Sequence, residues 1–223
     1  MSNEEKSPVI IFCLPGNNFS GRFLESFSLL LNLCHQAKAQ YYISRRESPV
    51  VYYVRNMCLG GDIRRGMNQK PFDGKIRYTH LMWIDSDMVF SVDHFKALFR
   101  QDRDIVSGIY KMADTVNFSV VENWDEEYLK QHGSFQFLNE DDMKKKEGLF
   151  EAVYTGLGFT LIRYGVFEAL QYPWFEPLSF QFGNIRDFCS EDVAFCRKAK
   201  EKGFNIWVDP AIKVGHEKKT VLW

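Results

Sequence analysis

The sequence lacks any apolar stretch of the ~20 residues that a helix needs to cross a bilayer. We therefore expect no transmembrane segment. The first six residues are polar and partly acidic, and they do not have the apolar centre of a signal peptide. With 45% hydrophobic and 16% aromatic residues, the chain of 223 residues can nevertheless bury a large core.

An excess of one charge is also absent. Lysine and arginine total 28, aspartate and glutamate total 29, and the net charge is −1. A nucleic-acid-binding protein would show a basic surplus, so we expect no nucleic-acid partner.

Cysteines are few, and none form a Cys-x-x-Cys pair among the five present. An odd number without regular spacing indicates reduced thiols. Together with the missing signal peptide, this favours a soluble protein of the cytoplasm.

Short apolar runs that predict strands alternate along the chain with segments whose apolar residues have helical spacing. Strands that alternate with helices predict an α/β fold, with a mixed, mostly parallel central sheet flanked by helices. No repeat or low-complexity linker divides residues 1–223, which favours a single domain. Residues 111–150 are polar and are expected to be irregular. Strands are expected at 9–14, 41–44, 50–54, 78–84, 104–110 and 204–208, and helices at 23–39, 56–67, 92–99 and 190–202.

Two aspartates, Asp85 and Asp87, end the apolar run that begins at His80. Successive side chains of a strand alternate between its faces, so these carboxylates would point the same way and reach one divalent cation. Mg²⁺ and Mn²⁺ commonly take few protein carboxylates and complete their shell with substrate phosphates. Asp-Ser-Asp also suits a turn or a helix cap, and on these residues alone this interpretation stays open.

The order of several short motifs resembles that of a GT-A fold glycosyltransferase. The resemblance covers about residues 8–218. In its compact size the chain resembles the glycosyltransferase domains of large algal viruses. The resemblance implies a GT-A-like domain with a nucleotide-sugar half at about 8–110 and an acceptor and catalytic half at about 111–223. The motifs are Phe12–Asn17, Arg55-Asn56, Asp85–Asp87, Gly156–Ile162, Ser190–Cys196 and Val214–His216.

The resemblance implies a metal site. It assigns Asp87 as a metal ligand, Asp85 to the metal or to the ribose and base side of the donor, and Ser86 to the nucleotide. His216 matches a late third ligand, and imidazole favours Mn²⁺ over Mg²⁺. An ordinary surface histidine is the alternative for His216.

The same resemblance implies contacts with the donor. Leu14, Pro15 and Gly16 would wrap the nucleotide base at a strand end, where α/β sheets bind ligands. Arg55 would contact a phosphate or the base, and two later glycines would let backbone approach the sugar and the acceptor. A turn glycine, a surface arginine and a strand bulge are the respective structural alternatives. The two later glycines are Gly156 and Gly158.

Two acids are candidates for catalysis. By resemblance Asp192 is the general base that deprotonates the acceptor hydroxyl, and Glu191 orients the acceptor. Ser190-Glu191-Asp192 would also make an ordinary acidic first turn of a helix. If Asp192 is not the base, a retaining reaction stays open. Three aromatic residues are candidates for stacking on an acceptor sugar, although we favour a core position for the last of them: Trp124, Trp174 and Phe175.

The implied function is a metal-dependent hexosyl- or deoxyhexosyltransferase. It would move a sugar from a nucleoside-diphosphate donor, expected to be UDP-linked, to a hydroxyl of a glycan or glycoprotein with inversion. One alternative is an inactive module that binds a nucleotide sugar or a glycan. Another is a sugar-1-phosphate nucleotidyltransferase, but that class needs a glycine-rich loop with arginine and lysine, and residues 15–22 are poor in both.

Overall fold

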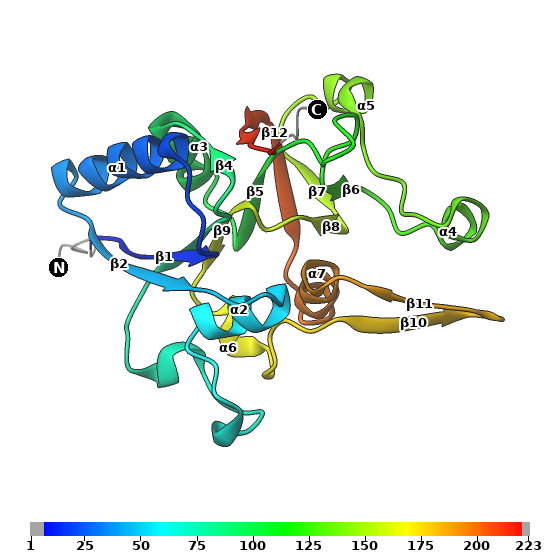
Figure 1. Ribbon diagram of the computed structural model, residues 1–223, viewed down its shortest axis with the longest axis horizontal. Coiled ribbons are helices and arrows are strands. Elements are labelled where there is room, and N and C mark those ends of the chain that lie inside the picture. Colours follow the sequence, from blue (N-terminus) through cyan, green and yellow to red (C-terminus); the bar gives the residue numbers. More distant parts are fainter. Residues whose placement is uncertain (1–6, 220–223) are drawn as a thin grey trace, which may run out of the picture.

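The computed structural model describes residues 7–219, and its centre is a seven-stranded sheet in the order β2-β1-β3-β9-β5-β12-β7 (Figure 1). β1 is parallel to β2 and β3, and β5 is parallel to β12, whereas β9 and β7 run the opposite way. The predicted α/β class with a mixed, mostly parallel sheet is therefore confirmed. The strands are β1 (Val9–Pro15), β2 (Gln40–Arg46), β3 (His80–Ile84), β5 (Ile105–Ile109), β7 (Phe150–Ala152), β9 (Phe159–Arg163) and β12 (Ile206–Lys213).

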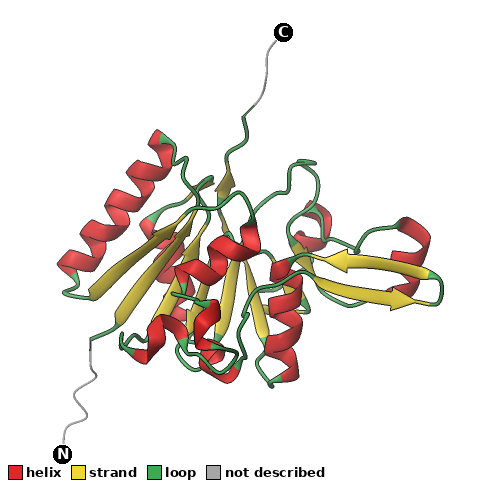
Figure 2. Cartoon of the chain, turned by 60° about the horizontal axis from the view of Figure 1, so that its bottom comes forward, coloured by secondary structure: helices red, strands yellow, loops and turns green. Residues whose placement is uncertain are grey.

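Helices cover both faces of the sheet because alternate strand residues supply an apolar surface to each side. Ile10 and Phe12 of β1 pack on one face with α1 and α3, whereas Ile11 and Cys13 pack on the other with α2, α6 and α7. Figures 1 and 2 show the two helical layers. The helices are α1 (Gly21–Gln36), α2 (Val51–Cys58), α3 (Val92–Arg100), α6 (Val166–Ala169) and α7 (Glu191–Glu201).

Smaller elements lie around the sheet. The hairpin of β10 (Leu178–Phe182) and β11 (Ile185–Cys189) extends away from it, directly before α7 (Figures 1 and 2). Two short antiparallel pairs and four short helices complete the fold. They are β4 (Met88–Val89) with β13 (Gly215–His216), β6 (Val120–Val121) with β8 (Tyr154–Thr155), α4 (Glu126–His132), α5 (Glu140–Lys144), η1 (Ile63–Arg65) and η2 (Pro71–Gly74).

The predicted strand at 50–54 and the predicted helix at 56–67 are wrong. One helix, α2, spans Val51–Cys58, and turns with the short η1 follow it. Valine and tyrosine favour strands through packing rather than through an intrinsic backbone preference. Here Val54 and Cys58 lie one helical turn apart and both are buried, so core packing selects the helix.

The remaining expected elements are present with shifted ends, and residues 111–150 are more ordered than predicted. Short helices and strands interrupt that region, and its residues Phe118 and Val120 are buried. All five cysteines are buried free thiols. Among residues 7–219, no helix has the length and apolar character that crossing a membrane requires.

Candidate active site

The acidic triplet does not continue the strand as expected but forms a turn after β3. The backbone N–H of Met88 donates to the carbonyl of Asp85 at 3.1 Å, which closes the turn. The two carboxylates consequently have different partners: Asp85 contacts Arg55, and Asp87 contacts His216 and Lys218.

Asp87 and His216 are brought together by the pairing of β4 with β13. The Nε2 of His216 lies 3.0 Å from Oδ2 of Asp87, and Nζ of Lys218 donates to the same oxygen at 2.8 Å. Gly215 permits this pairing, since a Cβ there would lie only 3.2 Å from the Cβ of Val89. Residues far apart in sequence thus form one polar group at the strand end.

The imidazole of His216 is oriented by the backbone. Its Nδ1 lies 2.6 Å from the carbonyl of Lys111. Because a carbonyl can only accept, Nδ1 donates to it, and Nε2 is the ring nitrogen that faces Asp87. Burial alone would raise the pKa of Asp87, but hydrogen bonds from His216 and Lys218 outweigh burial and lower this pKa to about 2. Asp87 is thus an ionised carboxylate near neutral pH.

A cavity of about 320 Å³ lies beside Asp87. Its walls are the loop that follows β1, the acidic turn, and the segment after β13: Asn17, Asn18, Phe19, Ser20, Ser86, Asp87, Glu217, Lys218 and Lys219. Gly16 allows the first two walls to meet. Its φ is +129°, and a Cβ there would lie 2.7 Å from Oγ of Ser86.

Two of the three residues predicted to wrap the base are buried in the protein. Leu14 is only 4% exposed and packs in the core with α1, and Pro15 is also buried. Asn17 and Asn18, which follow them, line the cavity instead. Their signal in the sequence was the turn-forming Pro-Gly-Asn-Asn at the end of an apolar strand.

Arg55 is buried in α2 and joins the two acidic motifs. Its Nε donates to Oε1 of Glu191 at 3.0 Å and one Nη donates to Oδ2 of Asp85 at 3.1 Å. Its guanidinium also lies 5.5 Å from the ring centre of Trp83. Burial alone would lower the pKa of Arg55, but the carboxylates of Asp85 and Glu191 outweigh burial and raise it, so the charge persists.

This cluster has unused hydrogen-bonding capacity. Nη1 of Arg55 and Oδ1 of Asp85 are buried and have no partner among the described residues. Burial and the nearby Asp192 carboxylate raise the pKa of Glu191, and Arg55 offsets only part of this. Glu191 is 5% exposed, and its carboxylate is held by Arg55.

Replacing Arg55 with methionine is expected to destabilise the protein by roughly 3–5 kcal/mol, because Glu191 would become an unpaired buried charge. Urea unfolding followed by circular dichroism measures the loss. Arg45→Met is the matched control: Arg45 pairs with Glu47, both are at least 44% exposed, and such pairs contribute less than about 1 kcal/mol. Equal losses in the two variants would contradict a buried ion-pair cluster.

Asp192 is fixed at the start of α7 and remains partly exposed. The Tyr154 hydroxyl donates to its Oδ2 at 3.0 Å, while Oδ1 accepts from the Ser190 hydroxyl and from the backbone N–H of Val193. Burial, followed by the charge of Asp192, raises the pKa of Tyr154, so its hydroxyl retains the proton that it donates. No motif in the sequence pointed to Tyr154, which only the fold brings to Asp192.

Gly156 and Gly158 are needed for close packing against protein side chains. A Cβ on Gly156 would lie 2.1 Å from the Tyr110 hydroxyl oxygen, and one on Gly158 would lie 2.9 Å from the same ring. The N–H of Gly158 donates to that hydroxyl at 3.1 Å, and its carbonyl accepts from the N–H of Asp85 at 3.0 Å. These glycines therefore position Tyr110 and the acidic turn, and Tyr110 was not recognised from the sequence.

The aromatic candidates for stacking are mostly internal. Trp174 and Phe175 are fully buried, so the prediction of a stacking platform is wrong for Trp174, and the core position favoured for Phe175 is confirmed. Asn56 holds this segment, since its amide donates to the Phe175 carbonyl and accepts from the Trp174 N–H. Trp124 is half-buried beneath the guanidinium of Arg197.

The candidate metal ligands do not form a complete protein site. Within residues 7–219, no three histidine, cysteine, aspartate or glutamate side chains gather closely enough to hold a metal ion. Asp87 and His216 supply two adjacent groups, and Asp85 lies on Arg55. A cation bound by the first two would need further ligands from water or substrate.

Comparison with known proteins finds no matching family model and no matching curated protein. The fold is similar to the crystal structure of A197 from STIV, with a TM-score of 0.50 and 18% identity over 97% of each chain. The structural similarity indicates a shared fold, and at this low sequence identity it says nothing of activity. The structure of the inositol-1-phosphate CTP transferase from T. maritima has a TM-score of 0.44 and 10% identity, over 95% of this chain and 89% of that one. A TM-score of that size supports no argument. The architecture is consistent with a GT-A-like fold.

Proposed function

We propose that this protein is a metal-dependent glycosyltransferase that moves a sugar from a nucleoside-diphosphate sugar, expected to be UDP-linked, to a hydroxyl acceptor. The observation that carries the proposal is the pair of Asp87 and His216 beside a cavity at the carboxyl end of β3. Open α/β sheets bind nucleotides at such strand ends.

The residues present fit Mn²⁺ or Mg²⁺. Nε2 of His216 and Oδ2 of Asp87 lie 3.0 Å apart, close enough to share one cation. The Lys111 carbonyl fixes the far side of the imidazole, as second-shell partners of metal-bound histidines do. A bound cation would neutralise charge that develops on the leaving diphosphate.

Side chains of the cavity have separate roles in this proposal. Lys218 pairs with Asp87 and can instead pair with a phosphate of the donor. Its positive charge would then still have a negatively charged partner. Asn17 and Asn18 line the cavity and offer amide groups to the base or ribose. Arg55 holds Asp85, so that Asp85 acts through the shape and charge of the turn rather than as a third metal ligand.

Asp192 acts on the acceptor side. Its carboxylate takes the proton of the attacking hydroxyl, and the hydrogen bond from the Tyr154 hydroxyl holds this carboxylate in position. Glu191, bound to Arg55, links the start of α7 to the acidic turn. One in-line displacement with this base inverts the anomeric configuration.

Replacing His216 with alanine is expected to raise the Mn²⁺ concentration for half-maximal activity at least tenfold, by analogy with the ~10–100-fold losses seen when metal-site contacts are removed. Electron paramagnetic resonance of free Mn²⁺ measures binding without reference to turnover. His132→Ala is a control, because His132 is an exposed histidine of α4. An unchanged Mn²⁺ titration would make His216 an ordinary structural histidine.

Calorimetric titration with UDP, GDP and CDP tests the donor site. One nucleoside diphosphate should bind in Mn²⁺ and bind at least about tenfold more weakly in excess chelator, because its phosphates complete the metal shell. Equal binding in both conditions, or no binding, would contradict the proposed site.

A further inference from the structure

A cavity of about 470 Å³ lies at the opposite end of β3 from the candidate active site. Tyr78 lines it and precedes β3, whereas Asp85 follows that strand. The extended chain between them spans on the order of 20 Å. The volume lies within the range of about 300–1,000 Å³ that is typical of small-molecule sites.

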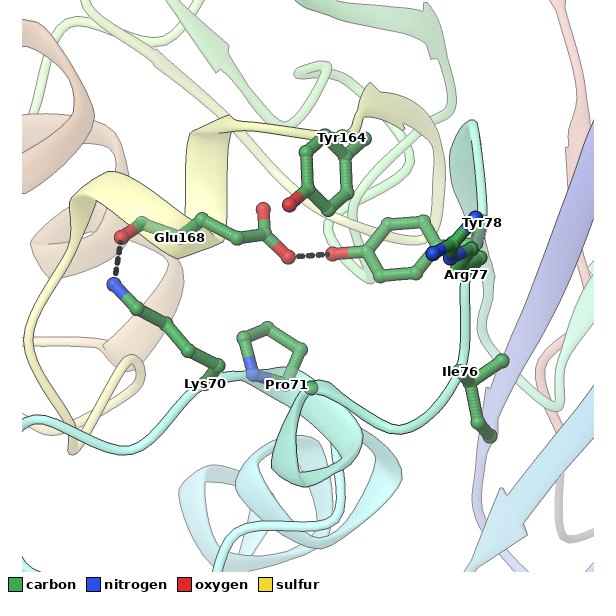
Figure 3. A pocket seen from close by; sticks show the side chains of 8 residues that line it. Lys70, Pro71, Ile76, Arg77, Tyr78, Tyr164 and Glu168 are labelled. Carbon is green, nitrogen blue, oxygen red and sulfur yellow. Dashed lines mark hydrogen bonds between the residues drawn. The ribbon is translucent and has the colours of Figure 1, made fainter.

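A fixed carboxylate faces this cavity. The Tyr78 hydroxyl donates to Oε1 of Glu168 at 2.5 Å, and the N–H of Gly165 donates to Oε2 at 2.8 Å. In the described part of the chain, no lysine, arginine or histidine forms a salt bridge with Glu168. Figure 3 shows its carboxylate joined to the Tyr78 hydroxyl by a dashed line, with the side chain of Tyr164 above them in this view. Each oxygen therefore retains capacity to accept from a ligand.

Two cationic side chains and one open aromatic ring share the cavity. Nζ of Lys70 donates to the backbone carbonyl of Glu168 at 2.6 Å, and Arg77 forms no salt bridge within residues 7–219. Tyr164 is 56% exposed and packs edge-on against Tyr78, with ring centres 5.3 Å apart. The cavity thus combines a carboxylate, two potential donors and an aromatic surface (Figure 3).

The chain beside the cavity is held in an unusual conformation. Phe72 and Asp73 have φ values of +53° and +59°, in the left-handed region that residues other than glycine seldom occupy. The N–H of Phe72 donates to the Leu59 carbonyl at 2.7 Å, and Arg65 pairs with Asp73 at 3.1 Å. These contacts fix the turn that carries Pro71 and Gly74 into the cavity wall.

We propose that this cavity binds a saccharide unit, at a site separate from the one proposed for sugar transfer. Glu168 would repel a phosphate, and Lys70 with Arg77 would repel an ammonium or metal ion. Sugar hydroxyls both donate and accept, so they can satisfy all three side chains. The apolar face of a sugar ring packs on an aromatic ring such as that of Tyr164.

Saturation-transfer NMR tests this proposal with methyl glycosides of glucose, galactose, mannose, xylose, fucose and N-acetylglucosamine. At least one is expected to bind, and Tyr164→Ala or Glu168→Gln should weaken its binding about tenfold. Tyr53→Ala is the matched control, since Tyr53 is a 57% exposed tyrosine of α2. Asp192→Asn, on the acceptor side of the proposed transfer site, should leave the signal unchanged, which separates this site from the transfer site.

Thermal unfolding of each variant shows whether the fold persists, and the exposed Tyr164 keeps the test informative if Glu168→Gln unfolds. Lack of binding by every glycoside would overturn the proposal. So would binding that Tyr164→Ala leaves unchanged, or Arg77-dependent binding of inorganic phosphate in the absence of glycoside binding. Each of these results leaves the proposed transfer reaction untouched.

Discussion

Asp87→Asn is expected to reduce sugar transfer by at least about 10³-fold, since a bound cation supplies several kcal/mol to the transition state and ~1.4 kcal/mol is tenfold in rate. Asparagine retains the shape of the side chain but removes the charge that binds the metal. The pKa of Asp87 is about 2, so the wild-type carboxylate is ionised throughout any neutral assay. Release of nucleoside diphosphate measures the loss.

Binding measurements should agree with this loss. Calorimetry is expected to show weaker Mn²⁺-dependent nucleotide binding by Asp87→Asn, while circular dichroism shows an intact fold. Asp93→Asn is the control, because Asp93 is 83% exposed at the start of α3. Full activity of Asp87→Asn, or full wild-type activity in excess chelator, would refute metal-dependent transfer.

Asp192→Asn is expected to lower turnover by about 10²–10⁴-fold, the usual contribution of a general base. Donor affinity should stay near the wild-type value, because Asp87, His216 and the cavity beside them are unaltered. Steady-state kinetics with varied donor separates the two effects. Asp187→Asn, in the exposed hairpin before α7, is the matched control.

The configuration of the product is an independent consequence of the same mechanism. If Asp192 is the base of a single displacement, the transferred sugar has the anomeric configuration opposite to that in the donor. Proton NMR of the product reports the configuration directly. Retention would exclude single displacement and would remove the reason for assigning Asp192 as its base.

The sequence predicted the sheet better than it predicted the segment between β2 and β3. Buried strands such as β1 and β3 are nearly continuous apolar runs, which indicate their own positions. Residues 50–54 have the composition of a strand, but they begin α2. Tertiary contacts decide this: the Asn56 side chain, buried on α2, binds the backbone of Trp174 and Phe175.

The order of motifs grouped the candidate residues, but it could not predict their contacts. Asp87 and His216 were proposed as neighbours through the order of motifs, and the structure places them 3.0 Å apart. The contacts of Arg55 with Glu191 and Asp85 join residues 136 and 30 positions apart, and no local pattern encodes such distances. For the same reason the sequence could not reveal that Tyr154 holds Asp192.

The most direct test of the account is an assay of free nucleoside diphosphate after mixing the protein with Mn²⁺, a panel of nucleotide sugars and simple glycoside acceptors. We expect release from one donor, dependent on metal and on Asp87, with the sugar recovered on the acceptor. Binding of a nucleotide sugar without any release would indicate a binding module. Release of pyrophosphate from a nucleoside triphosphate and a sugar phosphate, with no transfer to the glycosides, would indicate a nucleotidyltransferase and contradict the proposed function.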